Sequence, residues 1–262
     1  MKPARLLAIA GSDSSGGAGI QADIKTATAL GCYAMTAVTA VTAQDTTGVG
    51  AIQLMSPDVV REQIARCLGD IGADAIKIGM LGSAQIADVV AAVLAERAPA
   101  TPRIVDPVMI ATSGAALADD GVIDALKKSF FPGAALVTPN LPEAERLCGF
   151  ALRTGDDLLH AGANLLSLGA RAVLLKGGHG GSDTVTDLLF VPDAAPRSYI
   201  GKRVDTRHTH GTGCTLSSAI ACGLAQGMVL GDAIQRAHDF VQRAIRTAPG
   251  FGAGNGPINQ LP

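Results

Sequence analysis

The spacing of hydrophobic and polar positions changes repeatedly along this chain, and the changes predict strands that alternate with helices. Short apolar runs are typical of buried strands, whereas apolar residues three and four positions apart are typical of helices that cover a sheet. The runs expected to form strands are residues 5–10, 33–43, 51–55, 75–78, 103–105, 134–137, 172–175, 185–191 and 198–200. The last two are expected to form a hairpin.

Segments with helical spacing lie between these runs. We expect helices over residues 20–30, from Ser56-Pro57, from Ser83, over 120–130 and 140–147, from Thr154 through 168, and from Cys214 and Asp232. Ser56 followed by proline is a typical helix start, and Thr154 with Asp157 resembles a capping box. Residues 11–19 are expected to form a flexible glycine and serine loop, and residues 250–262 an irregular tail.

This alternation predicts an α/β fold, with a mostly parallel central sheet, helices on both faces in three layers, and right-handed crossovers. Internal repeats, low-complexity tracts and a convincing linker are absent from the sequence. We therefore expect residues 1–262 to form a single domain.

Composition and charge narrow the function classes. The 262 residues are 48% hydrophobic, which is ample for a large core, and carry a net charge of −2 with only 3% aromatic residues. A nucleic-acid partner is therefore not expected, because it requires a basic patch that is usually accompanied by stacking aromatics. The five cysteines form no CxxC pair, which favours reduced thiols in the cytoplasm over disulfides or zinc.

The apolar segments of the chain do not indicate export or insertion into a membrane. The apolar run near the N-terminus is too short for a signal peptide. Residues 26–44 and 211–231 are uncharged and long enough to span a bilayer, but their threonines and glycines favour buried elements instead. We expect a cytoplasmic protein without a membrane partner.

Polar side chains follow the predicted strands at the ends where ligands bind in open parallel sheets. Asp106 follows residues 103–105, Asn140 and Glu143 follow 134–137, and Lys176 follows 172–175. Carboxylates for Mg²⁺ and a lysine for phosphate are the groups that phosphoryl transfer requires. Structural alternatives exist for each: Asn140 with Glu143 can cap a helix, Asp106 can cap a turn, and Lys176 can be a solvated charge at the sheet edge.

A glycine turn at residues 211–213 leads into the helix predicted from Cys214. Free N–H groups and the helix dipole favour an anion there, and the same field favours a thiolate at Cys214, which could act as a base or a nucleophile. The alternative is a small buried structural cysteine. His179, His208 and His210 lack a metal-site spacing, and neither a Walker A nor a Rossmann glycine motif is present.

Taken together, these motifs resemble the hydroxymethylpyrimidine/phosphomethylpyrimidine kinase family of thiamine biosynthesis, within the ribokinase-like superfamily. The resemblance is carried by residues 10–23 (AGSDSSGGAGIQAD), 41–44 (VTAQ), 77–81 (KIGML), 106–109 (DPVM), 138–144 (TPNLPEA), 176–179 (KGGH) and 210–217 (HGTGCTLS). It implies ATP- and Mg²⁺-dependent phosphorylation of 4-amino-5-hydroxymethyl-2-methylpyrimidine and then of its monophosphate. It also implies a ribokinase-like fold and a homodimer.

The resemblance implies a role for individual residues. Gly211, Thr212 and Gly213 would hold the transferring phosphate, and Cys214 stands where the wider superfamily places an aspartate base. The pyrimidine pocket would comprise Gln44, Asp23, Ala18, Met80 and Val108. Lys176, Asn140 and Gly178 would contact the nucleotide phosphates, and Asp106 and Glu143 would act on Mg²⁺.

Three other functions stay open from the sequence. A pyridoxal or pyridoxine kinase shares the fold and the cysteine motif. A cysteine-nucleophile transferase or hydrolase would form a covalent intermediate on Cys214 and would not require ATP. A non-catalytic nucleotide or pyrimidine sensor would bind ligand without turnover.

Overall fold

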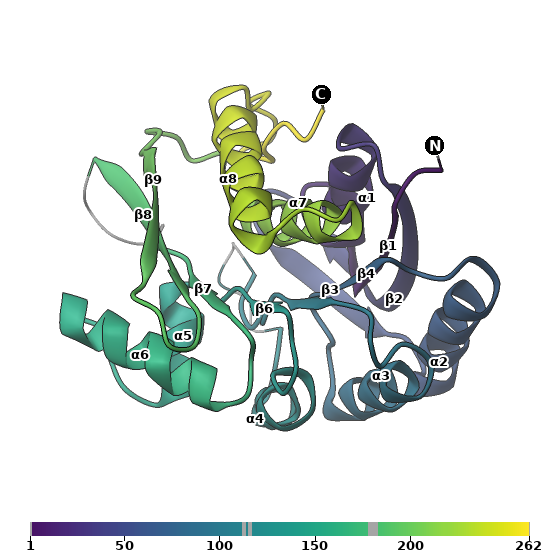
Figure 1. The fold of residues 1–262 in the computed structure, drawn as a ribbon. Coiled ribbons are helices and arrows are strands. Elements are labelled where there is room, and N and C mark those ends of the chain that lie inside the picture. The colour runs from purple at the N-terminus through teal and green to yellow at the C-terminus, as the bar shows by residue number, and fades with distance from the viewer. Residues whose placement is uncertain (1, 112–113, 115–116, 178–182, 262) are drawn as a thin grey trace.

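A nine-stranded sheet runs through the centre of the molecule (Figure 1). The computed structural model describes residues 2–111, 114, 117–177 and 183–261. The strands are β1 (Arg5–Asp13), β2 (Tyr33–Gln44), β3 (Val49–Leu54), β4 (Ala75–Ile78), β5 (Arg103–Val105), β6 (Leu136–Val137), β7 (Val173–Leu175), β8 (Thr184–Phe190) and β9 (Arg197–Lys202). Their order in the sheet is β3-β2-β1-β4-β5-β6-β7-β8-β9.

The predicted mostly parallel sheet is confirmed. The six central strands from β2 to β7 are parallel, and the antiparallel strands lie at the edges, with β3 against β2 and the hairpin β8–β9 against β7. Parallel strands require crossover connections, and helices supply them on both faces.

The helices form two layers (Figure 1). They are α1 (Gly19–Ala29), α2 (Pro57–Arg66), α3 (Ala84–Arg97), α4 (Asp120–Ala125), α5 (Leu141–Cys148), α6 (Gly155–Ser167), α7 (Thr212–Ala225) and α8 (Leu230–Arg246). Helices α1, α7 and α8 cover one face of the sheet, and α2 to α6 cover the other.

Each face of the sheet has its own hydrophobic core because successive strand residues point to opposite sides. Leu6 of β1 and Leu174 of β7 pack into the core beneath α1, α7 and α8, whereas the next residues, Leu7 and Leu175, pack into the core beneath α2 to α6. The short central strands are buried on both faces, as continuous apolar runs in parallel sheets are.

Several predicted boundaries are wrong. The helix expected over residues 120–130 is α4 followed by a π-helical turn, Leu126–Phe130, and a second such turn, Cys67–Ile71, extends α2. The strand expected at 134–137 pairs only over Leu136–Val137. The last helix begins at Leu230, two residues early, and α7 begins at Thr212 with Gly211 as its N-cap.

The loop expected at residues 11–19 is also different. Strand β1 continues through Ser12 and Asp13, which pair with Val41 and Thr42 of β2 after a register shift that follows Ala10. The shift explains why the apolar run ends before the strand does: beyond it, polar residues keep the β ladder while facing the carboxyl end of the sheet. As a result, Asp13 has a fixed position beside the helix α1 N-terminus.

The tail has no helix or strand over residues 251–261, as predicted, yet it is packed against the molecule. Gln260 is buried, and its Nε2 donates to the carbonyl oxygen of Gly17 at 3.0 Å. His210 forms an isolated β-bridge with Pro257. The tail therefore helps to hold the loops that follow β1 and β9.

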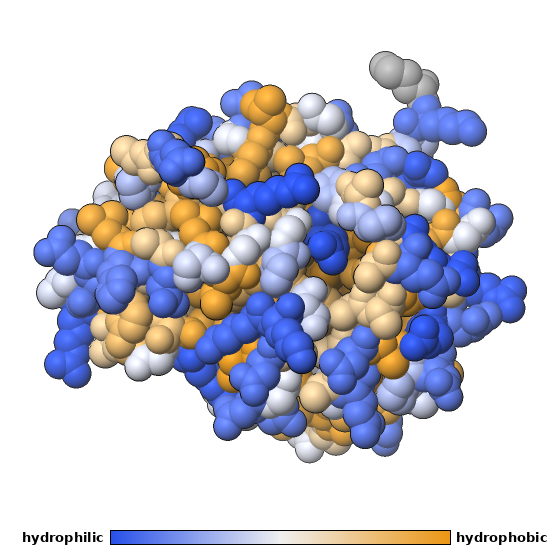
Figure 2. All heavy atoms as spheres, turned by 60° about the horizontal axis from the view of Figure 1, so that its bottom comes forward, coloured by the Kyte–Doolittle hydropathy of each residue, from blue (hydrophilic) through white to orange (hydrophobic). Residues whose placement is uncertain are grey.

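The surface carries both hydrophilic and hydrophobic side chains. Hydrophilic and hydrophobic residues are interspersed on the face shown in Figure 2, and the larger exposed hydrophobic residues are spread over many elements. Among the described residues, none of the helices combines the length and the hydropathy that crossing a membrane requires.

Candidate active site

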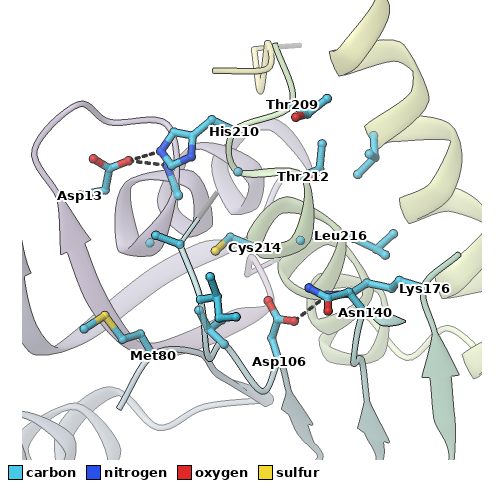
Figure 3. A pocket seen from close by; sticks show the side chains of 18 of the residues that line it. Asp13, Met80, Asp106, Asn140, Lys176, Thr209, His210, Thr212, Cys214 and Leu216 are labelled. Carbon is cyan, nitrogen blue, oxygen red and sulfur yellow. Dashed lines mark hydrogen bonds and ion pairs between the residues drawn. The ribbon is translucent and has the colours of Figure 1, made fainter. Parts of the chain in front are cut away.

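A cavity of about 600 Å³ opens at the carboxyl ends of the parallel strands (Figure 3). Most of the residues expected at a site contribute to its lining. They are Ala18, Gln44, Met80, Asp106, Val108, Asn140, Glu143, Lys176, Gly211, Thr212, Gly213 and Cys214. Gly178 and His179 lie outside the described residues.

The centre of the cavity holds an ion pair between Lys176, after β7, and Asp106, after β5. Lys176 Nζ lies 2.9 Å from Asp106 Oδ1, and Thr138 Oγ1 donates to the same oxygen at 3.1 Å. Burial alone would raise the pKa of Asp106, but the Lys176 and Lys77 ammonium groups hold it below its usual value. The carboxylate is therefore charged, and Lys176 is a largely buried, paired cation rather than a solvated edge charge.

Asn140 and Glu143 form a capping box at the start of α5. Asn140 Oδ1 accepts from the Glu143 N–H at 2.9 Å, and Glu143 Oε2 accepts from the Asn140 N–H at 2.8 Å. The capping interpretation is thus confirmed, and both side chains also line the cavity. Burial raises the pKa of Glu143 to about 7, against the opposing effect of Lys176.

The carboxylates suit a magnesium ion that is shared with phosphates. Among the described residues, no cluster of three or more histidine, cysteine, aspartate or glutamate side chains could hold a metal. Mg²⁺ in nucleotide sites typically takes one or two carboxylates, with waters and substrate phosphates completing its shell. Asp106 and Glu143 supply oxygen ligands of that kind, so the donor set fits Mg²⁺.

The glycine turn before α7 is shaped by a close backbone contact. Gly211 has φ +88°, and a Cβ at this position would lie 1.9 Å from the carbonyl oxygen of Gly17. A Cβ on Gly213 would lie 3.3 Å from Lys176 Nζ. Among the described residues, no side chain caps the N-terminus of α7. Backbone N–H groups and the helix dipole are therefore presented beside Lys176, where they favour an anion.

Cys214 lies in the first turn of α7, and the expectation of a lowered pKa is wrong. Burial raises the pKa of its thiol to about 11; Asp23 and Asp106 add to the rise, and Lys77 and the Gly19 N–H oppose it. The helix terminus is not sufficient to lower the pKa of the thiol, because burial and two nearby carboxylates disfavour a further negative charge. Without bound ligands, the thiol is protonated at neutral pH.

Asp23 does not line the cavity, contrary to its expected place in the pyrimidine pocket. Its carboxylate is fully buried, where it accepts from Lys77 Nζ at 2.9 and 3.0 Å and from Ser218 Oγ at 2.6 Å. Lys77, in the centre of β4, does line the cavity and was missed. The available signal was a lysine within the otherwise apolar run Ala-Ile-Lys-Ile.

Asp13 and His210 were also missed as site residues. They lie at one end of the cavity, where His210 Nε2 is 2.8 Å from Asp13 Oδ2 (Figure 3). Gln44 is next to them, with its Nε2 3.5 Å from His210 Nε2. The cavity therefore combines a polar end around Gln44 with a charged region around Lys176.

Comparison with known proteins gives a consistent result. A phosphomethylpyrimidine kinase family model matches residues 13–259. The chain is 43% identical to a hydroxymethylpyrimidine/phosphomethylpyrimidine kinase of Streptomyces coelicolor, over 98% of this chain and 94% of that protein. It is 47% identical to a thiamine biosynthesis bifunctional protein of Geobacter sulfurreducens, over 98% of this chain but only 52% of that longer protein.

A solved structure supports the ribokinase-like fold. An ADP complex of Bacillus subtilis pyridoxal kinase superposes with a TM-score of 0.91 at 34% identity, covering 99% of this chain and 98% of the other. The predicted fold class is confirmed.

Two glycine substitutions, one at each end of α7, test the role of the glycine turn. Gly211→Ala places a Cβ against the Gly17 carbonyl, so we expect the turn to shift and kcat to fall about 100-fold or more, as when an anion-stabilising group is displaced. Gly227→Ala is the matched control: Gly227 also has a positive φ of +81°, but no atom of the described residues lies within 4 Å of an added Cβ. It should cost roughly 1–2 kcal/mol of stability and leave kcat unchanged. Equal kcat values for the two variants would contradict this account.

Because the pKa of Glu143 is raised in the folded protein, we expect the free energy of unfolding to depend on pH. The folded protein retains a proton on Glu143 up to about pH 7, whereas the unfolded chain releases it near the ordinary glutamate pKa of 4.5. The carboxyl therefore stabilises the protein below that value, and its contribution is lost as pH rises through 7. Glu143→Gln should gain stability relative to the unsubstituted protein between pH 5 and 8, on the order of 1–3 kcal/mol. Denaturant unfolding without ligands measures the difference in free energy of unfolding between the two proteins. We expect this difference to grow as the pH rises toward 7.

Proposed function

Because the chain belongs to the phosphomethylpyrimidine kinase family, we propose that it phosphorylates 4-amino-5-hydroxymethyl-2-methylpyrimidine and then its monophosphate, with ATP as donor, in thiamine diphosphate biosynthesis. The observation that carries this proposal is the order of groups along one cavity. Cys214 lies between Met80 on one side and Lys176 with Asp106 on the other (Figure 3). An acceptor hydroxyl at the thiol would thus have a phosphate site beside it.

The phosphate side is suited to stabilising the transferring group. Lys176 and the N–H groups of the 211–213 turn would contact phosphoryl oxygens, and Asn140 would contribute an amide. Asp106 and Glu143 are the residues that would hold Mg²⁺, which neutralises phosphate charge when bound. Phosphoryl transfer depends mainly on such positioning and charge neutralisation, so this arrangement can supply most of the catalysis.

The acceptor side is suited to a small heteroaromatic alcohol. Ala18, Met80 and Val108 line the cavity with apolar groups, and Gln44 offers one donor and one acceptor from the same amide. An aminopyrimidine edge, with an amino group next to a ring nitrogen, is complementary to that amide. This match supports the pyrimidine as substrate.

Cys214 is the residue that would take the proton of the acceptor hydroxyl. A pKa of about 11 means that only a small thiolate fraction exists at pH 7 in the free protein. As a base of this strength, the thiolate is well able to accept the proton, and the rate should rise with pH from neutrality. A cysteine-nucleophile enzyme would require the same thiolate, so the requirement for ATP, and not this pKa, separates the two functions.

A pyridoxal kinase is the second candidate, and one observation favours it. The Bacillus subtilis structure that covers nearly the whole chain at a TM-score of 0.91 is a pyridoxal kinase. We place it second because the relative from Streptomyces coelicolor is a pyrimidine kinase at higher identity.

We also propose that residues 1–262 act as one kinase domain, in the cytoplasm and as a homodimer. The described cysteines are all free, which supports a reducing compartment. The dimer is supported by the family resemblance of the sequence.

Turnover with Mg·ATP and three alternative acceptors tests the function. We expect ADP release with the hydroxymethylpyrimidine and with its monophosphate, and little with pyridoxal. Cys214→Ser should lower kcat with both pyrimidines by about 100-fold or more, because the hydroxyl is a much weaker base than the thiolate. Faster turnover of pyridoxal would contradict the pyrimidine as substrate. Absence of ADP with all three acceptors in folded protein would contradict the kinase activity. A Cys214→Ser variant with near-full activity would exclude the cysteine as base.

A further inference from the structure

The side chain of Asp13, at the end of β1, is surrounded by hydrogen-bond donors. Its Oδ2 accepts from the N–H groups of Gly17 at 3.1 Å and Ala18 at 2.8 Å, and its Oδ1 accepts from the Ser15 N–H at 2.9 Å. These hydrogen bonds, together with the one from His210, hold the pKa of Asp13 below its usual value although burial acts in the opposite direction. The side chain is therefore a carboxylate.

The carboxylate determines where the proton of His210 lies. His210 Nε2 is 2.8 Å from Asp13 Oδ2, and both residues are only 3% exposed. An ionised carboxylate can only accept a hydrogen bond, so His210 Nε2 must carry a hydrogen. That nitrogen consequently has no lone pair to offer a second donor.

This proton position in turn constrains the amide of Gln44. The Nε2 position of Gln44 is 3.5 Å from His210 Nε2, and two N–H donors cannot bond each other. Amide nitrogen and oxygen have nearly the same shape, so the surrounding donors and acceptors decide their assignment. A half-turn of the amide places its oxygen toward His210 and its NH₂ group toward Thr42.

Thr42 supports the same assignment from the other side of the amide. Thr42 Oγ1 lies 3.0 Å from the carbonyl oxygen of Ser12 and 3.2 Å from the Gln44 amide. A hydroxyl has one proton, and the Ser12 carbonyl can only accept it. Thr42 Oγ1 must then accept from Gln44, which requires the NH₂ group on that side.

We infer that Asp13 and His210, with Thr42, are positioning residues that fix the orientation of the Gln44 amide and so determine which ring edge the site recognises. With the amide fixed, its forward edge presents an acceptor on the His210 side and a donor on the Thr42 side. An amino group next to a bare ring nitrogen matches this order in one ring orientation. A ring with an oxo group next to an N–H has the reverse order, and it could satisfy both contacts only if turned over.

The inference deepens the proposed function, on which it rests for the identity of the ring. Turning the ring over would move its hydroxymethyl group away from Cys214 and the glycine turn. The network therefore links recognition at one end of the cavity to placement of the reacting oxygen at the centre.

Two variants of His210 separate positioning from bulk structure. His210→Gln can place an NH₂ donor near the position of Nε2, whereas His210→Met fills similar space without a donor. The readouts are KM and kcat for the aminopyrimidine alcohol, for its 4-oxo counterpart, and for Mg·ATP. The unsubstituted protein should prefer the aminopyrimidine by about 100-fold or more in kcat/KM, because the wrong edge leaves buried polar groups unpaired.

We expect His210→Met to raise KM for the aminopyrimidine about 10-fold and to reduce the preference over the oxo counterpart by a similar factor, with KM for Mg·ATP unchanged. His210→Gln should retain the preference. Thr42→Val, which removes the opposite contact, should also reduce it and serves if His210→Met is unfolded. Unchanged preference in His210→Met and Thr42→Val, or an equal loss for every substrate including ATP, would overturn the inference.

A spectroscopic measurement does not depend on which substrate is correct. In ligand-free protein, ¹⁵N-labelled at histidine, the Nε2 resonance of His210 should be that of a protonated nitrogen. A bare Nε2 would overturn the inference even if the pyrimidine is the substrate. A protonated Nε2 in a protein that phosphorylates only pyridoxal would retain the network and overturn the proposed substrate.

Discussion

Two buried ion pairs, Lys176 with Asp106 and Lys77 with Asp23, are the constraint on which the site depends. Lys77 of β4 and Asp23 of α1 are both fully buried, whereas Lys176, after β7, is 12% exposed where it pairs with Asp106, after β5. Removing one partner from a buried pair leaves an uncompensated charge, which typically costs about 3–5 kcal/mol. The pairs are therefore more than local contacts. They keep two lysines charged in the lining of the cavity, and they set the electrostatic environment of Cys214.

The loops around this charged centre are held by one close backbone approach and by side-chain hydrogen bonds. Gly211 approaches the Gly17 carbonyl so closely that a Cβ could not be accommodated, and Gln260 of the tail donates to the same carbonyl. The His210–Asp13 interaction connects the same two loops at a position beside Gln44. As a result, the loop after β1, the turn before α7 and the tail form a fixed frame. In the proposed function, substrate recognition and phosphate binding would share this frame, which favours accurate placement of the acceptor oxygen.

The sequence predicted the fold and most of the cavity lining because both follow from local patterns. Asp106, Asn140 and Lys176 come directly after buried strands, and parallel strands bring their carboxyl ends to one edge. What could not be predicted depends on contacts between distant segments. Asp23 has the same local sequence whether it faces a pocket or Lys77, 54 positions away, and only the packing of α1 on β4 decides between them. The pKa of Cys214 is likewise set by burial and by two carboxylates from other elements, which outweigh the helix terminus.

In the proposed function, this cavity transfers a phosphoryl group directly from nucleotide to acceptor, with Cys214 as a base and not as a covalent carrier. The stereochemical course at phosphorus distinguishes these two roles of Cys214. ATP with a chiral, isotopically labelled γ-phosphoryl group should give the pyrimidine monophosphate with inverted configuration, because a single in-line displacement inverts the phosphorus centre. Retention would require two successive displacements through an enzyme-bound phosphate and would contradict the account.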